Sequence, residues 1–125
     1  MRFLENKYFE NQSEDYGLSE SYLKDVLNNV FEGRSESLGS KLYKIRAKGR
    51  SKGKSGGFRN IFFWKKGEII IFCYIFPKNE KDNLSKKDLK GLRILSKEYA
   101  SLTDKEIEEM ISHKNLKEVG YEEKQ

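Results

Sequence analysis

The sequence predicts an α+β fold in which a small antiparallel sheet follows one helix and precedes two more. Three observations predict it. Apolar residues repeat at helical spacing over residues 18–33, and strand-like patterns fill residues 42–76. Two helix-start signals then follow, at residues 84–89 and 102–107. Strands grouped between helices, rather than alternating with them, are typical of the α+β class.

The chain has 125 residues, the usual size of one domain, and shows no internal repeat. We therefore expect a single domain over residues 1–125. Residues 1–17 carry only a few apolar side chains, which are enough for a short strand or turn. We expect residues 1–17 to be a peripheral lead-in and residues 120–125 to be a peripheral polar tail.

The first helix has a clear start, stripe and end. Ser19 is a natural N-cap, and Leu18 and Leu23 flank it at the spacing of a hydrophobic staple. Gly33 is a typical residue to end the helix. The apolar stripe between these signals consists of Tyr22, Leu23, Val26, Leu27, Val30 and Phe31.

The strand region begins after residues 34–40, which we interpret as a loop. From residue 42 the period becomes two, so alternate side chains point to opposite faces. One face receives Tyr43, Ile45 and Ala47, and the other receives Lys44, Arg46 and Lys48. Residues 49–57 are rich in glycine and cations and predict a mobile basic loop.

Two further strands are predicted at residues 58–64 and 69–76, joined by a hairpin turn at residues 65–67. The second is apolar on both faces, as a central strand covered on both sides would be, and Pro77 ends it.

Two C-terminal helices start with matching signals. Each signal combines two apolar residues of a hydrophobic staple with the N-cap and acidic residue of a capping box. The residues are Leu84, Ser85, Asp88 and Leu89 for the first helix, and Leu102, Thr103, Glu106 and Ile107 for the second. A short strand is expected at residues 116–119.

Positive charge is concentrated in one part of the chain. The whole chain has 25 basic and 20 acidic residues, a net charge of +5. Residues 37–67 contain ten of the basic residues and no acidic one, which leaves 15 basic against 20 acidic residues elsewhere. A positive block on an otherwise acidic chain indicates a localised site for a polyanion.

Several classes of protein are excluded. No run of apolar residues is long enough for a membrane span, and the N-terminus lacks the apolar segment of a signal peptide, so we expect a cytoplasmic protein. With one cysteine, Cys73, and one histidine, His113, neither a Cys-based zinc site nor a Cys–His hydrolase is available, and we expect no metal and no cofactor. Gly53-Lys54-Ser55 is not a P-loop, because Lys48 stands where its first glycine belongs.

The remaining chemistry is that of the cations. An array of lysine and arginine neutralises phosphates and predicts salt-dependent binding of nucleic acid. Nearby aromatics, namely Phe58, Phe63, Trp64 and Tyr74, would stack on RNA bases or pack in the core, and core packing is the expectation for most of them. Cleavage of RNA through its own 2′-hydroxyl needs a base, an acid and cations on the phosphate. Because like charges disfavour the protonated form of lysine, a lysine in this block is a candidate base.

Two segments resemble landmarks of a known family. The run from Leu42 to Arg59, with Gly53-Lys-Ser-Gly-Gly-Phe-Arg59 at its end, resembles the core of the RelE/HigB toxins of bacterial type II toxin–antitoxin systems. Phe76-Pro-Lys-Asn-Glu80 resembles that family's second landmark, and the likeness covers about residues 18–119.

The resemblance implies a RelE-like fold and a ribosome-associated endoribonuclease (mRNA interferase) that cuts mRNA by metal-free general acid–base catalysis and inhibits translation. It implies that a cognate antitoxin, often a helix-turn-helix protein, holds the toxin inactive. The toxin would reach operator DNA only through this antitoxin. The catalytic positions that it implies are Lys44, Arg46, Arg59 and Lys78. The RNA-binding positions expected beside them are Lys48, Arg50, Lys52, Lys54 and Asn79. The general base stays open between Lys44 and the lysines at 48, 52 and 54.

Two other functions use the same residues. A non-catalytic RNA- or ribosome-binding protein would bind through the same cations without cleavage. A ParE-like toxin, which shares the fold, would act on gyrase instead, although the dense basic block favours the nuclease.

Overall fold

The structure is a computed structural model that describes residues 1–49, 57–79 and 83–122. Its helices and strands follow one another along the chain in this order: β1 (Arg2–Asn6), α1 (Lys7–Asp15), α2 (Glu20–Phe31), β2 (Glu36–Gly39), β3 (Leu42–Ala47), β4 (Phe58–Lys65), β5 (Ile69–Pro77), α3 (Lys86–Ala100), α4 (Asp104–Ser112) and β6 (Leu116–Glu118). The described strands form one six-stranded sheet in the order β2-β3-β4-β5-β1-β6. This arrangement confirms the α+β class.

The sheet is mostly antiparallel, with one exception. The pairs β2–β3, β3–β4, β4–β5 and β1–β6 are antiparallel, whereas β1 runs parallel to β5. A shift in register opposite Ile61 and Phe62 places one extra residue, Cys73, in β5. The antiparallel sheet that the sequence predicted is confirmed, and the parallel pair of β1 with β5 is an addition to it.

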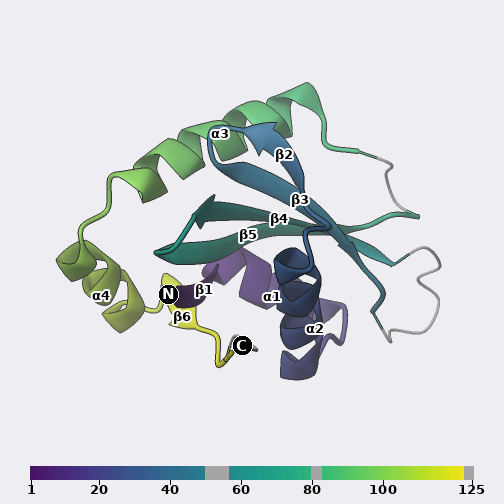
Figure 1. Ribbon diagram of the computed structural model, residues 1–125, viewed down its shortest axis with the longest axis horizontal. Helices are drawn as coiled ribbons and strands as arrows, with labels where there is room; N and C mark the ends of the chain where they lie inside the picture. The colour runs from purple at the N-terminus through teal and green to yellow at the C-terminus, as the bar shows by residue number, and fades with distance from the viewer. Residues whose placement is uncertain (50–56, 80–82, 123–125) are drawn as a thin grey trace.

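Helices cover both faces of the sheet, as Figure 1 shows. One core cluster joins α1 and α2 to the sheet and includes Phe9, Val26 and Phe62. The second cluster lies on the opposite face under α3 and includes Ile61, Phe63 and Leu92. Because both faces are covered, β5 is buried on both sides, which confirms the central strand predicted from its apolar run.

Residues 1–17 do not form a peripheral lead-in. β1 lies inside the sheet between β5 and β6, and its Leu4 is fully buried. The Asn6 side chain then caps α1 by accepting a hydrogen bond from the Phe9 N–H at 2.9 Å. The Asn6 amide donates to the Tyr99 hydroxyl at 3.1 Å and so ties this start to α3. The chain therefore has two helices before the main hairpins, rather than the one predicted.

Residues 34–40 are not simply a loop, because four of them form the edge strand β2. Glu36 pairs with Lys44 and Gly39 with Leu42 across the β2–β3 hairpin. The two residues of the turn, Ser40 and Lys41, both have positive φ, at 55° and 61°. Two successive positive φ angles define the turn whose twist suits a two-residue hairpin.

The other predicted boundaries are confirmed. α2 begins directly after Ser19 and ends at Phe31. Gly33, which has φ of 82°, then turns the chain away from the helix. The N-cap Ser85 accepts from the Asp88 N–H at 3.0 Å at the start of α3. The start of α4 forms a full capping box, in which Thr103 accepts from the Glu106 N–H at 3.1 Å and its own N–H donates to the Glu106 carboxylate at 3.0 Å.

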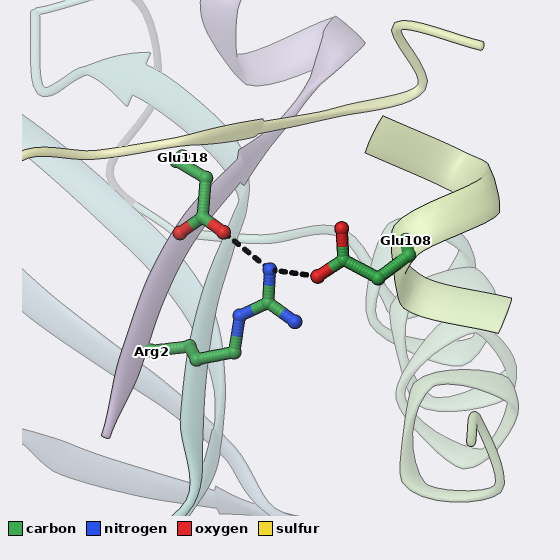
Figure 2. Close-up of polar contacts among 3 residues, drawn as sticks. All are labelled: Arg2, Glu108 and Glu118. Carbon is green, nitrogen blue, oxygen red and sulfur yellow. Dashed lines mark hydrogen bonds and ion pairs between the residues drawn. The ribbon is translucent and has the colours of Figure 1, made fainter. Parts of the chain in front are cut away.

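The two ends of the described chain meet on one side of the sheet. Arg2 on β1 forms ion pairs with Glu118 of β6 and with Glu108 of α4, the second at 2.8 Å (Figure 2). Tyr121, in the predicted tail, stacks on Phe31 and donates a hydrogen bond to Asn28 at 2.7 Å. Residues 120–122 thus pack against α2 in part, and residues 123–125 lie outside the described part of the chain. No helix in the described residues is long and apolar enough to cross a membrane.

Candidate functional site

The predicted site residues meet where β3 ends, β4 begins and β5 ends. Arg46 on β3 lies directly opposite Arg59 on β4 in the strand register. The backbone N–H of Lys78 donates to the carbonyl of Gly57 at 3.0 Å, which brings the end of β5 to the same place. The strands thus converge at one end of the sheet, the right-hand end in Figure 1.

The alternation of side chains places these cations on one face. Ile61 and Phe63 belong to the core cluster beneath α3, and residues two apart on a strand share a face. Arg59 therefore faces the α3 side, and so do its cross-strand neighbour Arg46 and, two residues earlier, Lys44.

Two adjoining hollows open at this end of the sheet. The first, which we name the cationic groove, has a volume of about 480 Å³ and is lined by Arg34, Glu36, Lys44, Ile45, Arg46, Arg59 and Lys78. The second, which we name the α2 pocket, has a volume of about 450 Å³ and is lined by Asp25, Asn29, Arg34, Arg46, Ala47, Lys48 and Lys78. Three cations are common to both, so the two hollows are neighbours.

Charge in the cationic groove is strongly unbalanced. Of the seven described residues that line it, five are cations and one, Glu36, is a carboxylate. Arg59 is 6 % exposed, which is unusual for an arginine, whereas the Arg46 side chain is exposed to solvent. Such a concentration of positive charge in a concave surface attracts and holds anions.

Lys44 is held by two polar partners. Its Nζ lies 3.4 Å from a carboxylate oxygen of Glu36 on the paired edge strand β2. It also donates to the side-chain oxygen of Asn83, just before α3, at 3.4 Å. The side chain is only 17 % exposed, so the ammonium has a defined position at the wall of the groove.

Not all of the predicted residues lie in the cationic groove. Lys44, Arg46, Arg59 and Lys78 all line it. Lys48 is exposed and lines the α2 pocket. Asn79 is exposed at the end of β5 and does not line either hollow. The predicted basic loop, with Arg50, Lys52 and Lys54, lies outside the described residues.

The structure adds residues that the sequence did not single out. Arg34 and Glu36 come from the segment interpreted as a loop, and Asn83 follows β5. Asp25 and Asn29 come from the polar face of α2. Glu36 lies opposite Lys44 because of a hairpin turn at Ser40-Lys41, which has no glycine or asparagine to mark it in the sequence.

Most of the candidate aromatics belong to the core. Phe58 and Phe63 are fully buried, and Trp64 packs with the cluster on the α2 face. Tyr74 lies on the groove face, opposite Ile61, where its ring stacks on Tyr8 at a centroid distance of 5.4 Å.

Two glycines fix the chain beside the groove. A Cβ atom on Gly57, which has φ of 71°, would lie 2.4 Å from the carbonyl oxygen of Ala47. A Cβ on Gly49 would lie 2.5 Å from the ring of Phe58. Close approach of two backbone segments therefore requires glycine at position 57, and close packing against the Phe58 side chain favours it at position 49.

The sulfur and imidazole groups lie elsewhere. Cys73 is buried, and burial raises the pKa of its thiol to about 12, as expected of a small buried hydrophobe. The His113 ring contacts the carbonyl of Glu109 at 2.7 Å at the end of α4. Within the described residues, no three His, Cys, Asp or Glu side chains form a group that could hold a metal ion.

Comparison with known proteins identifies a family. Residues 1–119 match the model of the "RelE toxin of RelE / RelB toxin-antitoxin system". The matched range includes every element from β1 to β6 and every described residue of the cationic groove. No curated protein matches the chain.

Proposed function

The chain belongs to the RelE toxin family and is the toxin of a toxin–antitoxin system, and from this premise we propose that it is a ribosome-associated endoribonuclease. In this proposal it cleaves mRNA and so inhibits translation. The observation that carries the proposal is the cationic groove, whose described lining contains five cations and a single carboxylate. The cations come from β3, from β4, from the residues before β2 and from the turn after β5.

The groove has the charge that a phosphodiester requires. In cleavage through the 2′-hydroxyl, the O2′ atom loses its proton and attacks phosphorus, the bond from phosphorus to O5′ breaks, and O5′ takes up a proton. Negative charge builds on the non-bridging oxygens in the transition state, where preorganised donors stabilise it. We assign this role to Arg59 and Arg46, because guanidinium groups bind phosphate through two parallel hydrogen bonds.

The pair Glu36–Lys44 supplies one group that can accept a proton and one that can donate a proton. A carboxylate accepts a proton and an ammonium donates one, and the two lie 3.4 Å apart in the groove. We therefore propose Glu36 as the group that takes the 2′-hydroxyl proton and Lys44 as the donor to O5′ or to the phosphate. This differs from the initial expectation that a lysine is the base. The five cations provide the positive charge, so the proposed reaction uses no metal ion.

The remaining predicted residues fit substrate binding. Lys78 and Lys48 extend the positive surface from the groove to the α2 pocket. We propose that they hold phosphates of neighbouring nucleotides, together with Arg50, Lys52, Lys54 and Asn79. Contacts of this kind add affinity without reading sequence.

Membership of the family implies an antitoxin partner. We propose that this antitoxin is a helix-turn-helix protein that is encoded beside the toxin and that contacts operator DNA itself. We further propose that the toxin acts in the cytoplasm, where its mRNA substrate is translated.

The test compares the wild type with Arg46→Gln and Arg59→Ala, expressed from a tightly controlled promoter. Wild type should arrest growth and cleave mRNA. Each variant should cleave about 100-fold more slowly, because each loses a group that stabilises the transition state. Arg46 is exposed, so its variant should fold normally even if removal of the buried Arg59 does not permit folding. Thermal unfolding of both variants checks this.

Lys97→Gln, an exposed cation near the C-terminal end of α3, is the matched control and should act like wild type. Intact mRNA in wild-type cells would contradict the proposal. Salt-sensitive RNA binding without cleavage would identify an RNA- or ribosome-binding protein, and DNA damage without loss of mRNA would identify a gyrase-directed toxin.

A further inference from the structure

The α2 pocket contains a carboxylate, Asp25, that forms no ion pair within the described residues, whereas the carboxylate of the cationic groove, Glu36, pairs with Lys44. Asp25 lines this hollow with four cations, three of which also line the cationic groove. A carboxylate that is not paired with a cation repels phosphate, so we expect the part of the RNA that contacts Asp25 to offer hydrogen-bond donors instead. The following inference rests on the proposed function and concerns which part of the RNA enters this pocket.

The pocket lies between α2 and the free part of β3. Asp25 and Asn29 are four residues apart on α2, so their side chains lie one above the other on the same face. β2 pairs with β3 only as far as Lys44, and α2 packs against β3. Ala47 gives the pocket a small apolar wall. Its volume of about 450 Å³ lies in the range of pockets that hold small ligands.

Asp25 is not used to hold the cations around it. Arg34, the nearest cation in sequence that lines the pocket, pairs with Glu32 at 3.0 Å. No ion pair joins Asp25 to any cation in the described ranges, and its side chain is exposed. The carboxylate and the neighbouring Asn29 amide are therefore available to a ligand.

We propose that the α2 pocket binds a nucleobase next to the scissile phosphate and selects bases that carry an exocyclic amino group. Asp25 accepts hydrogen bonds from that amino group, and the Asn29 amide, which both donates and accepts, contacts a neighbouring edge atom. Guanine, adenine and cytosine carry such a group. Uracil has none, and its single N–H donor on that edge lies between two carbonyl oxygens that face the Asp25 carboxylate unfavourably. Reading the hydrogen-bonding edge of an unpaired base is the usual way in which proteins recognise single-stranded RNA.

The test maps the 5′ ends of cleaved transcripts after brief expression of wild type, Asp25→Asn and Asp15→Asn. Asp15 is an exposed aspartate at the end of α1, outside both hollows, so it is the matched control. In wild type, uracil should be depleted about tenfold at one fixed position beside the cut, the discrimination of one good base contact. Asp25→Asn replaces an acceptor with a group that also donates, so uracil should become acceptable there, while Asp15→Asn keeps the wild-type profile.

Each outcome distinguishes the inference from the proposed function. If wild type cleaves but the profile of Asp25→Asn equals that of Asp15→Asn, the pocket does not read bases, and the nuclease stands. If Asp25→Asn slows cleavage equally at all sites, Asp25 acts on the reaction rather than on base choice, and the inference is wrong. Absence of any cleavage by wild type would overturn the proposed function, and the inference with it.

Discussion

The two ends of the sheet differ in how their charges are balanced. At the end formed by β1 and β6, Arg2 lies between the carboxylates of Glu108 and Glu118. At the other end, the described lining of the cationic groove has five cations and one carboxylate, Glu36. Both ends include charged residues on strands of the same sheet, so the fold itself does not demand the difference.

The comparison separates charge that serves the fold from charge that serves a ligand. A cation between carboxylates is neutralised within the chain and contributes a little stability. Like charges gathered in a groove repel one another, and an anionic ligand offsets this repulsion. The unbalanced end is therefore the one to which we assign function, and the following variants test that assignment.

Glu36→Gln should produce the largest effect on activity and almost none on stability. The amide keeps the size of the side chain but no longer accepts a proton, so cleavage should slow by about 10²–10⁴-fold, the usual contribution of a general base. Glu36 is exposed, so the free energy of unfolding of its variant should lie within about 0.5 kcal/mol of the wild-type value. Cleavage rates and denaturant unfolding give the two readouts.

A matched control exists in the other hairpin. Glu68 pairs with Lys65 at 3.1 Å, much as Glu36 pairs with Lys44, but it lies outside the groove. Glu68→Gln should leave cleavage unchanged. If both variants cleave at the wild-type rate, another group is the general base, and the single carboxylate of the groove has no role in catalysis.

Gly57→Ala should destabilise the groove end by about 2–3 kcal/mol, because it combines a strained positive φ with a backbone clash. The added Cβ would lie 2.4 Å from the carbonyl oxygen of Ala47, which is backbone and has little freedom to move. Gly67→Ala is the control, since its φ of 82° is similar but nothing lies within 4 Å of its Cβ position. Equal losses in the free energy of unfolding for the two variants would show that the close approach carries no cost.

Glu5→Gln should change the pH dependence of stability at the β1 end. Burial, aided by repulsion from Glu10, raises the pKa of Glu5 to about 7 in the folded state, above the ordinary value of a carboxyl group. The folded protein therefore binds more protons than the unfolded chain between these values, so stability falls as pH rises towards 7. Because Glu5 is partly exposed, the expected loss between about pH 5 and about pH 8 is about 1 kcal/mol.

Unfolding by denaturant at both pH values measures the Glu5 effect. Glu5→Gln should remove this part of the pH dependence and be the more stable protein at the higher pH. Glu109→Gln, an exposed carboxylate on α4, should keep the wild-type slope. A slope that is the same in Glu5→Gln and in wild type would mean that Glu5 titrates normally.

The sequence predicted most elements because their signals are local. The stripe of α2, the capping box at Thr103 and the apolar run of β5 depend on residues close together in the chain. For residues 1–17 the sequence allowed a short strand or turn but did not predict the place of β1 inside the sheet. That place is not encoded locally, because β1 pairs with β5 and β6, which lie far away in sequence. Parallel pairing of this kind leaves no turn signal in the sequence.

The candidate site was predictable to the same extent. Alternation along β3 placed Lys44 and Arg46 on one face, and their grouping with Arg59 follows from the hairpin register. Glu36 was missed because Ser40-Lys41 lacks the glycine or asparagine that usually marks this type of turn. Asp25 and Asn29 were missed because nothing in the polar face of a helix tells which of its residues face a neighbouring strand.

Arg2→Met should have the smallest effect and completes the comparison. The variant keeps most of the apolar stem and loses both ion pairs, which join β1 to β6 and α4 (Figure 2). The Arg2 side chain is 29 % exposed and its partners are more exposed, so the expected loss in the free energy of unfolding is under about 1 kcal/mol. Since salt screens exposed pairs, the loss should shrink further between about 0.05 M and about 1 M NaCl.

Cleavage by Arg2→Met should be unchanged, because Arg2 lies at the balanced end of the sheet. A cleavage defect with wild-type stability would mean that this end also contributes to function, and the distinction between balanced and unbalanced charge would then fail.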